Sequence, residues 1–122
     1  MIPIAVSFAG SFGAVSRFIL DGHIRLKYDH SFPWATMVIN TTGSLLLGIL
    51  SGVLLRYKGF TDIETIIGVG FCGGYTTFST ASFETVRLLE RRKYLSAIGQ
   101  AVGGLLLTVV AASVGIVLGQ LL

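Results

Sequence analysis

Residues Gly73–Thr80 have the sequence Gly-Gly-Tyr-Thr-Thr-Phe-Ser-Thr, and they interrupt an otherwise apolar segment that runs from Ile63 to about Phe83. Two glycines followed by four hydroxyl residues are a poor continuation of a helix in lipid. Free backbone groups are tolerated at membrane depth only where they are buried in protein or line a watery cavity. The stretch therefore predicts a broken helix at the centre of a transport pathway. Because glycine, serine and threonine also let helices pack closely, a role in packing alone is the alternative.

The composition predicts an integral membrane protein. The chain has 122 residues, of which 52% are hydrophobic and 12% are charged, and its mean hydropathy is +0.80. A soluble domain carries about twice that charged fraction. A span needs ~20 mostly apolar residues, so the length allows at most about four spans and no soluble domain besides. The net charge of +3 is too small and scattered to indicate a nucleic-acid partner, and the single cysteine, Cys72, excludes an internal disulfide and argues against zinc.

The apolar runs are long and do not alternate, so we expect an all-α fold rather than strands. Residues 1–122 are expected to form one transmembrane domain of four helices, at about 2–20, 34–55, 63–89 and 94–122, with the third helix broken near Gly73–Thr77. The N-terminus lacks a basic region and a cleavage site, so it is interpreted as a retained first span. Residues 21–32 are predicted to form a polar loop that holds His23 and His30 in solvent, and Pro33 to open the second helix.

Small residues recur every four positions on two of the predicted spans. Such stripes let helix backbones approach closely and favour helix association in lipid. We therefore expect a tight four-helix protomer that associates into at least a dimer. The stripes consist of Asn40, Ser44, Gly48 and Gly52 on the second span and Gly99, Gly103, Ala111, Gly115 and Gly119 on the fourth.

Basic residues are unevenly shared between the two predicted sides of the membrane. Only Arg56 and Lys58 belong to the side of the second loop. Short loops rich in Lys and Arg stay cytoplasmic, so the bias predicts one fixed orientation in the plasma membrane, with both termini outside. The basic residues on the side of the first and third loops are Arg17, Arg25, Lys27, Arg87, Arg91, Arg92 and Lys93.

The polar residues within the spans are mostly neutral hydrogen-bond donors. Asn40 lies well inside the second span and Thr108 inside the fourth, and Ser79 and Thr80 belong to the interrupted stretch. Neutral donors suit an anion that must lose water without being trapped, because conduction needs weak or multiple sites. Taken singly, each hydroxyl is better interpreted as bonded to its own helix. Together with Asn40 and the helix break, they indicate an anion pathway.

Three further residues are candidates for this pathway. The positive edge of the Phe78 ring can face an anion, although a lipid-facing or core role is an equal alternative. Glu84 is the one acid deep in a span, and it could gate, pair with Arg87 one turn away or accept hydrogen bonds from a helix. Arg17 ends the first predicted span, where it could reach the interface or attract anions into a vestibule.

The chain resembles the small bacterial fluoride channels called Fluc or CrcB over almost its whole length. The first matching motifs are Gly10-x-x-Gly13-Ala14-x-x-Arg17 and Thr36-x-x-x-Asn40-x-x-Gly43-Ser44. The most specific match is Gly73–Thr80, which is followed by the similar tail Ser82-Phe83-Glu84.

The resemblance implies an antiparallel dimer of four-helix subunits with two fluoride pathways, in the multi-pass setting of the bacterial plasma membrane and its lipid. Its role would be passive export of fluoride, which relieves fluoride toxicity. It further implies a structural sodium ion held by backbone carbonyls, which here belong to Gly73 and Thr76. Such a cation would offset the carbonyls that the helix break frees, as in other oxygen-ligand sites. The implied pathway residues are Asn40, Phe78, Ser79, Thr80 and Thr108, with Glu84 towards one end and Arg17 in the vestibule.

One position departs from the family pattern. The family usually has a second phenylalanine where this chain has Ala81, and each pathway takes one ring from each subunit. Phe83 projects about 200° around the helix from position 81 and does not replace it. Together with the charge bias, this departure favours a heterodimer with an oppositely oriented homologue over a homodimer.

Two other functions remain as alternatives. A non-conducting or half-conducting partner subunit is compatible with Ala81. A small drug/proton antiporter needs an acid in the first span, and residues 2–20 contain no Asp or Glu. An enzyme is not expected, because no catalytic constellation is found in the sequence.

Overall fold

The computed structural model describes residues 1–28 and 31–122, and the described part of the chain is helical without strands. His30 lies outside the described residues. The all-α fold class is therefore confirmed. The elements in chain order are α1 (Ile2–Lys27), α2 (Trp34–Arg56), α3 (Thr61–Glu64), the π-helix η1 (Thr65–Cys72), α4 (Gly73–Tyr75), α5 (Phe78–Glu90), α6 (Tyr94–Ile98), the π-helix η2 (Gly99–Gly103) and α7 (Gly104–Leu121).

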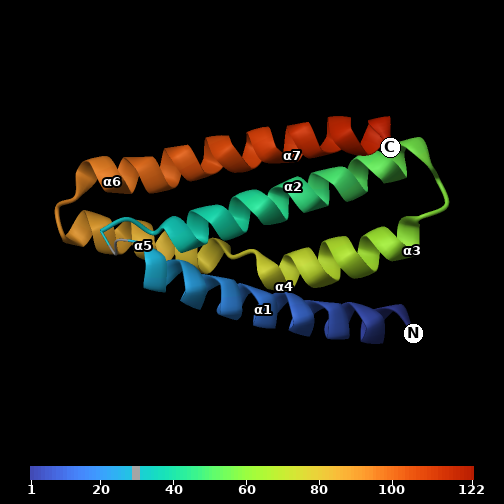
Figure 1. The fold of residues 1–122 in the computed structure, drawn as a ribbon, viewed down its shortest axis with the longest axis horizontal. Helices are drawn as coiled ribbons and strands as arrows, with labels where there is room; N and C mark the ends of the chain where they lie inside the picture. Colours follow the sequence, from blue (N-terminus) through green and yellow to red (C-terminus); the bar gives the residue numbers. More distant parts are fainter. Residues whose placement is uncertain (29–30) are drawn as a thin grey trace.

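The elements run side by side along the length of the molecule (Figure 1). Both termini and the connection between α2 and α3 lie at one end, and the C-terminal end of α1 and the connection between α5 and α6 lie at the other. Arg56 and Lys58 therefore lie at the first end, and the basic run 91–93 at the second. The charge bias seen in the sequence thus separates the two ends of the fold.

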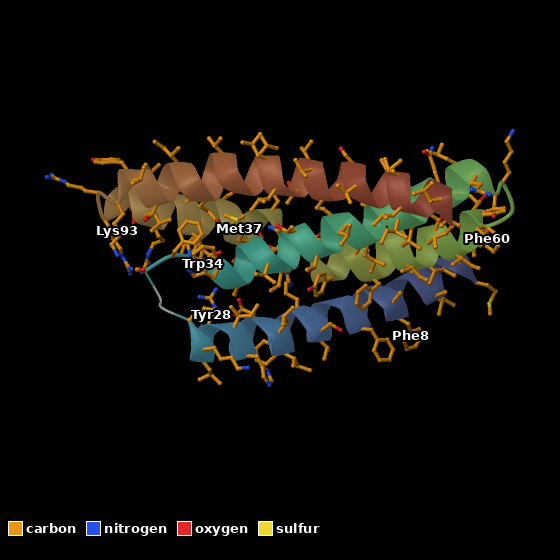
Figure 2. All side chains as sticks on the ribbon, turned by 45° about the horizontal axis from the view of Figure 1, so that its top comes forward. Phe8, Tyr28, Trp34, Met37, Phe60 and Lys93 are labelled. Carbon is orange, nitrogen blue, oxygen red and sulfur yellow. The ribbon has the colours of Figure 1, made fainter. Side chains whose placement is uncertain are left out.

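Three helical stretches in the described part of the chain are long and apolar enough to cross a membrane, namely Ile2–Lys27, Trp34–Arg56 and Tyr94–Leu121. Large apolar side chains lie exposed along their length, among them Phe8 and Phe18 on α1 and Leu105 on α7. Figure 2 shows Phe8 pointing away from the other helices. An outer surface of this kind suits lipid, because a soluble monomer rarely exposes extended apolar surface.

Helix α1 is longer than the sequence predicted. The expected loop from Asp21 is wrong as far as Lys27, and His23 is helical, with its ring nitrogen 2.9 Å from the Ile19 carbonyl oxygen. The Arg25 guanidinium pairs with the Asp21 carboxylate one turn earlier at 2.8 Å. Basic residues in the last turn also complement the negative end of the helix dipole. The next helix begins at Trp34, so Pro33 precedes it rather than opening it.

Glycine on α2 and α7 makes their close contact possible. A Cβ on Gly48 would lie 2.3 Å from the Ala112 carbonyl oxygen, and one on Gly115 would lie 2.4 Å from the Leu45 carbonyl oxygen. These parts of the predicted stripes are therefore used inside the protomer. By contrast, a Cβ on Gly103 would have no neighbour within 4 Å.

The same principle holds α1 against η1 and α4. A Cβ on Gly13 would meet the Phe71 carbonyl oxygen at 2.1 Å, and one on Gly74 would meet the Gly10 carbonyl oxygen at the same distance. Cys72 is buried nearby, where it serves as a small apolar packing residue. These contacts place η1 and α4 beside α1.

Replacing Gly115 by alanine is expected to lower stability by about 1–3 kcal/mol, because the added methyl group must push α2 and α7 apart. Thermal unfolding of the purified protein in detergent, followed by circular dichroism, measures this effect. Gly22→Ala is the matched control, since nothing lies within 4 Å of its Cβ position and alanine favours helix. Equal unfolding temperatures for the two variants would contradict the close-packing argument.

Candidate functional site

The helical stretch from α3 to α5 lies where the sequence predicted the third span, and we call it the third crossing. It is broken at two extended residues. Thr76 has φ −80° and ψ 162°, and Thr77 has φ −150° and ψ 120°. The break thus lies at the C-terminal edge of the predicted region, and the glycine pair before it is still helical. Adjacent β-branched residues favour extended backbone. Gly74 is needed instead for the close approach to α1 described above.

Asn40 pairs with the backbone of the break. Its Nδ2 donates to the Thr77 carbonyl oxygen at 2.8 Å, and its Oδ1 accepts from the Thr77 N–H at 2.8 Å. One amide side chain from α2 therefore satisfies both backbone groups of Thr77, whose side chain is itself buried. Unpaired, these groups would be expensive in a membrane. The sequence analysis identified Asn40 as an anion donor but not as the clamp of the break.

Thr77 also starts the second half of the crossing. As the N-cap of α5, its Oγ1 accepts from the Thr80 N–H at 3.1 Å and lies 3.0 Å from the Thr80 Oγ1. The Ser79 hydroxyl oxygen lies 3.4 Å from the Thr77 Oγ1. The hydroxyls that the sequence singled out thus gather at the N-terminal end of a 13-residue helix, where the helix dipole favours negative charge.

A groove of about 720 Å³ runs beside the break, between α2, the third crossing and the helix that includes η2. It brings together three of the predicted pathway residues, namely Asn40, Phe78 and Thr108. The Phe78 ring is 87% exposed, so in one protomer it has little packing partner. Ser79, Thr80, Glu84 and Arg17 do not line this groove.

Gln100 also lines the groove, and the sequence analysis missed it. It is 5% exposed, and its Oε1 has no hydrogen-bond partner among the described residues. The residue lies in the π-helical turn η2, a geometry often found at functional sites. A sequence signal existed, since Gln100 is a polar residue within the long apolar run 94–122.

Two hydroxyls follow the simpler interpretation. The Thr76 Oγ1 donates to the Cys72 carbonyl oxygen at 2.8 Å, and the Thr108 Oγ1 donates to the Leu105 carbonyl oxygen at 3.0 Å. Each is bonded to its own helix, as Ser and Thr side chains commonly are. Thr108 still lines the same groove as Asn40.

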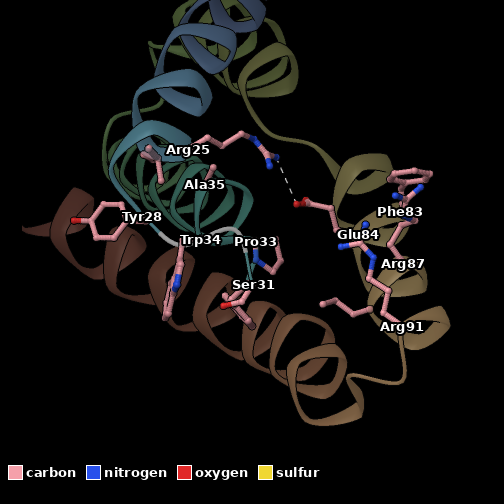
Figure 3. Close-up of a pocket in the computed structure, with 13 residues that line it drawn as sticks. Arg25, Tyr28, Ser31, Pro33, Trp34, Ala35, Phe83, Glu84, Arg87 and Arg91 are labelled. Carbon is pink, nitrogen blue, oxygen red and sulfur yellow. Dashed lines mark ion pairs between the residues drawn. The ribbon is translucent and has the colours of Figure 1, made fainter.

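Glu84 does not pair with Arg87, as one sequence alternative had it. Its Oε1 accepts from the Thr36 hydroxyl, and its Oε2 lies 3.5 Å from the Arg25 Nη2 (Figure 3). Arg87 instead lies over the Phe83 ring, with its Cζ 5.5 Å from the ring centre. The prediction of a loop at Arg25 hid this partner, because only the helical extension of α1 carries Arg25 to Glu84.

Arg17 lies within α1, which continues past it to Lys27. Its Nη1 donates to the Thr76 carbonyl oxygen at 3.4 Å. Each of the two extended residues therefore contacts a side chain from another helix. Arg17 on α1 contacts Thr76, and Asn40 on α2 contacts Thr77.

Comparison with known sequences shows the family to which the chain belongs. The profile of the family described as "CrcB-like protein, Camphor Resistance (CrcB)" matches residues 4–119. The chain belongs to this family. It is 45% identical over 99% of its length, and 88% of the relative's, to "Fluoride-specific ion channel FluC 1" of Leifsonia xyli subsp. xyli. It is 43% identical to "Fluoride-specific ion channel FluC 2" of Cutibacterium acnes over 98% of each chain, and 38% identical to "Fluoride-specific ion channel FluC" of Thermococcus kodakarensis over 98% of this chain and 96% of the relative.

In this CrcB chain the described residues hold no cluster of His, Cys, Asp or Glu side chains that could bind a metal. Backbone carbonyls are a different kind of ligand. The Thr77 N–H donates to Asn40, so the Gly73 carbonyl loses the donor that an unbroken helix would supply. The Thr76 carbonyl has two lone pairs, and the Arg17 guanidinium occupies one side of it.

Proposed function

We propose that this CrcB-family chain forms a fluoride-selective channel through which fluoride leaves the cytoplasm passively. The observation that carries the proposal is the broken crossing, clamped by Asn40 and opening beside a groove that Phe78 and Thr108 line. Its relatives over nearly the full chain are named fluoride-specific ion channels. An ion channel also agrees with the expectation that the chain is not an enzyme.

The chemistry of the groove suits a small anion. Fluoride must exchange its water for donors, and the second Nδ2 proton of Asn40 and the positive end of α5 are available for this purpose. The edge of the exposed Phe78 ring adds a weakly positive surface. None of these groups carries a full positive charge, so an ion can enter and leave.

The proposal includes four crossings and an antiparallel dimer. The third crossing, from α3 to α5, would cross the membrane together with α1, α2 and the helix from α6 to α7, and its break would be tolerated in lipid because Asn40 satisfies its backbone groups. Small residues line the groove, including Ala101 and Gly104, and Gly73 is exposed beside them. Such a surface suits close approach of a second subunit, which would also cover the Phe78 ring.

An oppositely oriented homologue is favoured as that second subunit. A homodimer with opposed subunits inserts one sequence both ways and needs little charge bias, whereas here the basic run 91–93 and Arg56 mark opposite ends. The orientation proposed is that of short basic loops in the cytoplasm of a bacterial plasma membrane, with both termini outside. Ala81, which lines the groove without a ring, also favours a partner that supplies the missing phenylalanine.

A sodium ion at the centre of the dimer belongs to the same proposal. The Gly73 carbonyl fits such an ion, because the break has freed it and it is exposed. The Thr76 carbonyl fits only if Arg17 turns away, since a cation there would lie against the guanidinium. When bound, the ion would offset the negative ends of the carbonyl dipoles at the break.

Efflux from liposomes tests the function. The purified chain, alone and together with a co-expressed partner, is reconstituted with fluoride inside, and a fluoride electrode follows release against a chloride control. We expect fluoride-only efflux from the competent assembly and its loss on Phe78→Ile. Chloride efflux of equal rate would contradict fluoride selectivity. Intact efflux in the assembled Phe78→Ile variant would instead support the second candidate, a non-conducting partner subunit, which Ala81 favours.

Gln100→Leu is expected to lower fluoride efflux by about tenfold, the effect of one lost hydrogen bond to a charged group. Thermal stability should stay equal or rise, because the substitution removes a buried oxygen that lacks a partner. Efflux and unfolding are measured on the same preparation. A large loss of stability would show that Gln100 supports the fold, and unchanged efflux would remove it from the pathway.

A further inference from the structure

A second cavity, distinct from the groove, lies at the end of the molecule that carries most of the basic residues. Its volume is about 260 Å³, and its lining combines three arginines with aromatic side chains. Arg25 enters from α1 on one side, and Arg87 on α5 and Arg91 at its C-terminal cap enter from the other (Figure 3). Glu84 lies between them. We call this cavity the arginine pocket.

Among the described residues, the arginine pocket holds more positive than negative charge. Among its described lining residues Glu84 is the one acid, and it is already engaged by Arg25 and the Thr36 hydroxyl. Arg87 and Arg91 have no acidic partner in the described part of the chain. Arg91 follows Arg87 by one turn at the C-terminal end of α5, a spacing at which like charges repel. An anion bound between them would relieve this repulsion.

The aromatic lining indicates the depth of the pocket in the membrane. The centres of the Trp34 and Phe32 rings lie 4.7 Å apart at the N-terminal end of α2, and Tyr28 follows the end of α1. Trp and Tyr concentrate at the level of lipid headgroups. Apolar side chains around this end, such as Leu26 and Leu95, are exposed for contact with acyl chains.

Guanidinium groups select the chemistry of the anion. Their planar forks match two phosphate oxygens in a bidentate manner, whereas a halide ion offers a single atom to both donors. The volume of about 260 Å³ admits a phosphate group with part of its ester, and not a whole lipid. Basic pockets between helices on the cytoplasmic side are a known form of site for anionic headgroups.

We propose that the arginine pocket binds the phosphate of an anionic phospholipid headgroup through Arg87 and Arg91, with Trp34 at the headgroup level. The acyl chains lie along the exposed apolar surface beside it. Of the implied pathway residues Glu84 lines this pocket, whereas the groove residues Asn40, Phe78 and Thr108 do not.

The chain reports on this site through its only tryptophan, Trp34, which lines the pocket. The full-length protein is reconstituted in phosphatidylcholine with increasing fractions of dibrominated phosphatidylglycerol, and quenching of Trp34 fluorescence measures lipid enrichment at the pocket. Dibrominated phosphatidylcholine gives the reference. We expect phosphatidylglycerol to be preferred by roughly fivefold, which corresponds to about one basic residue at a membrane surface.

Two variants assign the preference to the pocket. The double variant Arg87→Gln/Arg91→Gln should abolish it, and Arg87→Lys/Arg91→Lys should weaken it, because lysine keeps the charge and loses the fork. Lys27→Gln/Lys93→Gln removes the same charge from the same end outside the pocket and should keep the preference. Equal loss in the lysine-to-glutamine control would mean general surface attraction and would overturn the proposal.

A free ion is the other source of the same chemistry. Inorganic phosphate is titrated onto the protein in neutral detergent at constant ionic strength, with Trp34 emission as the readout. No change is expected below the concentrations that screen surface charge. A saturable change that Arg87→Gln/Arg91→Gln abolishes would assign the site to soluble phosphate and overturn the lipid.

Discussion

Asn40→Leu is expected to abolish fluoride efflux and to lower the stability of the fold. Leucine has the same number and branching of side-chain heavy atoms as asparagine but leaves the Thr77 N–H and carbonyl without partners, at about 1–3 kcal/mol for each buried group. The two halves of the third crossing would then lose their register beside the groove. Liposome efflux measures the first effect and thermal unfolding in detergent the second.

The neighbouring Thr41 provides a matched control. Its Oγ1 is buried and has no partner among the described residues, so Thr41→Val should leave stability unchanged or raise it. If Asn40→Leu lost efflux and kept full stability, Asn40 would act on the ion alone, and the clamp would not be the source of its importance.

Ala81→Phe is expected to turn the chain, reconstituted alone, from a silent protein into a fluoride channel. On the heterodimer proposal each pathway needs one ring from each subunit, and a pair of identical chains lacks the second ring. Ala81 lines the groove three residues after Phe78, so a ring there lies on the same face of α5. The expected change is from leak-level efflux to release that is fast on the time scale of the electrode.

Leu89→Phe adds the same ring elsewhere on α5, outside the groove, and should leave the chain silent. Rapid efflux from the unmodified chain alone, equal to that of Ala81→Phe, would refute the need for a partner. The chain would then be a self-sufficient channel in which Ala81 is tolerated.

The sequence predicted the parts of the fold that depend on composition and on local chemistry. Long apolar runs revealed the helices, and the stretch Gly73–Thr80 revealed the break. The site of the break within that stretch did not follow, because Gly74 serves a contact with Gly10 that only the packed structure contains. The extended residues are Thr76 and Thr77, which need Asn40 and Arg17 as partners.

Long-range polar contacts were the least predictable part of the site. Arg25 looked like a loop residue, since Asp21–Lys27 is polar, yet an ion pair one turn apart continues the helix and brings Arg25 to Glu84. Gln100 was not predicted, although a polar residue within an apolar span is usually functional whether or not it carries a hydroxyl. The depth of Asn40 within its span correctly marked it as a candidate. Its partner, the backbone of Thr77, is 37 residues away in sequence and is revealed only by the folded structure.

The clamp at the break also sets an order for the making of the protein. Helix α5 contains Glu84, Arg87 and Glu90 within 13 residues, so it is too polar to enter a bilayer on its own account. Its partners Arg25, Thr36 and Asn40 all come earlier in the chain. As the ribosome delivers the polypeptide from its N-terminus, α1 and α2 can reach the membrane first and present these groups. We therefore expect the second half of the third crossing to be inserted onto a waiting polar surface, and to be rejected when α2 is missing.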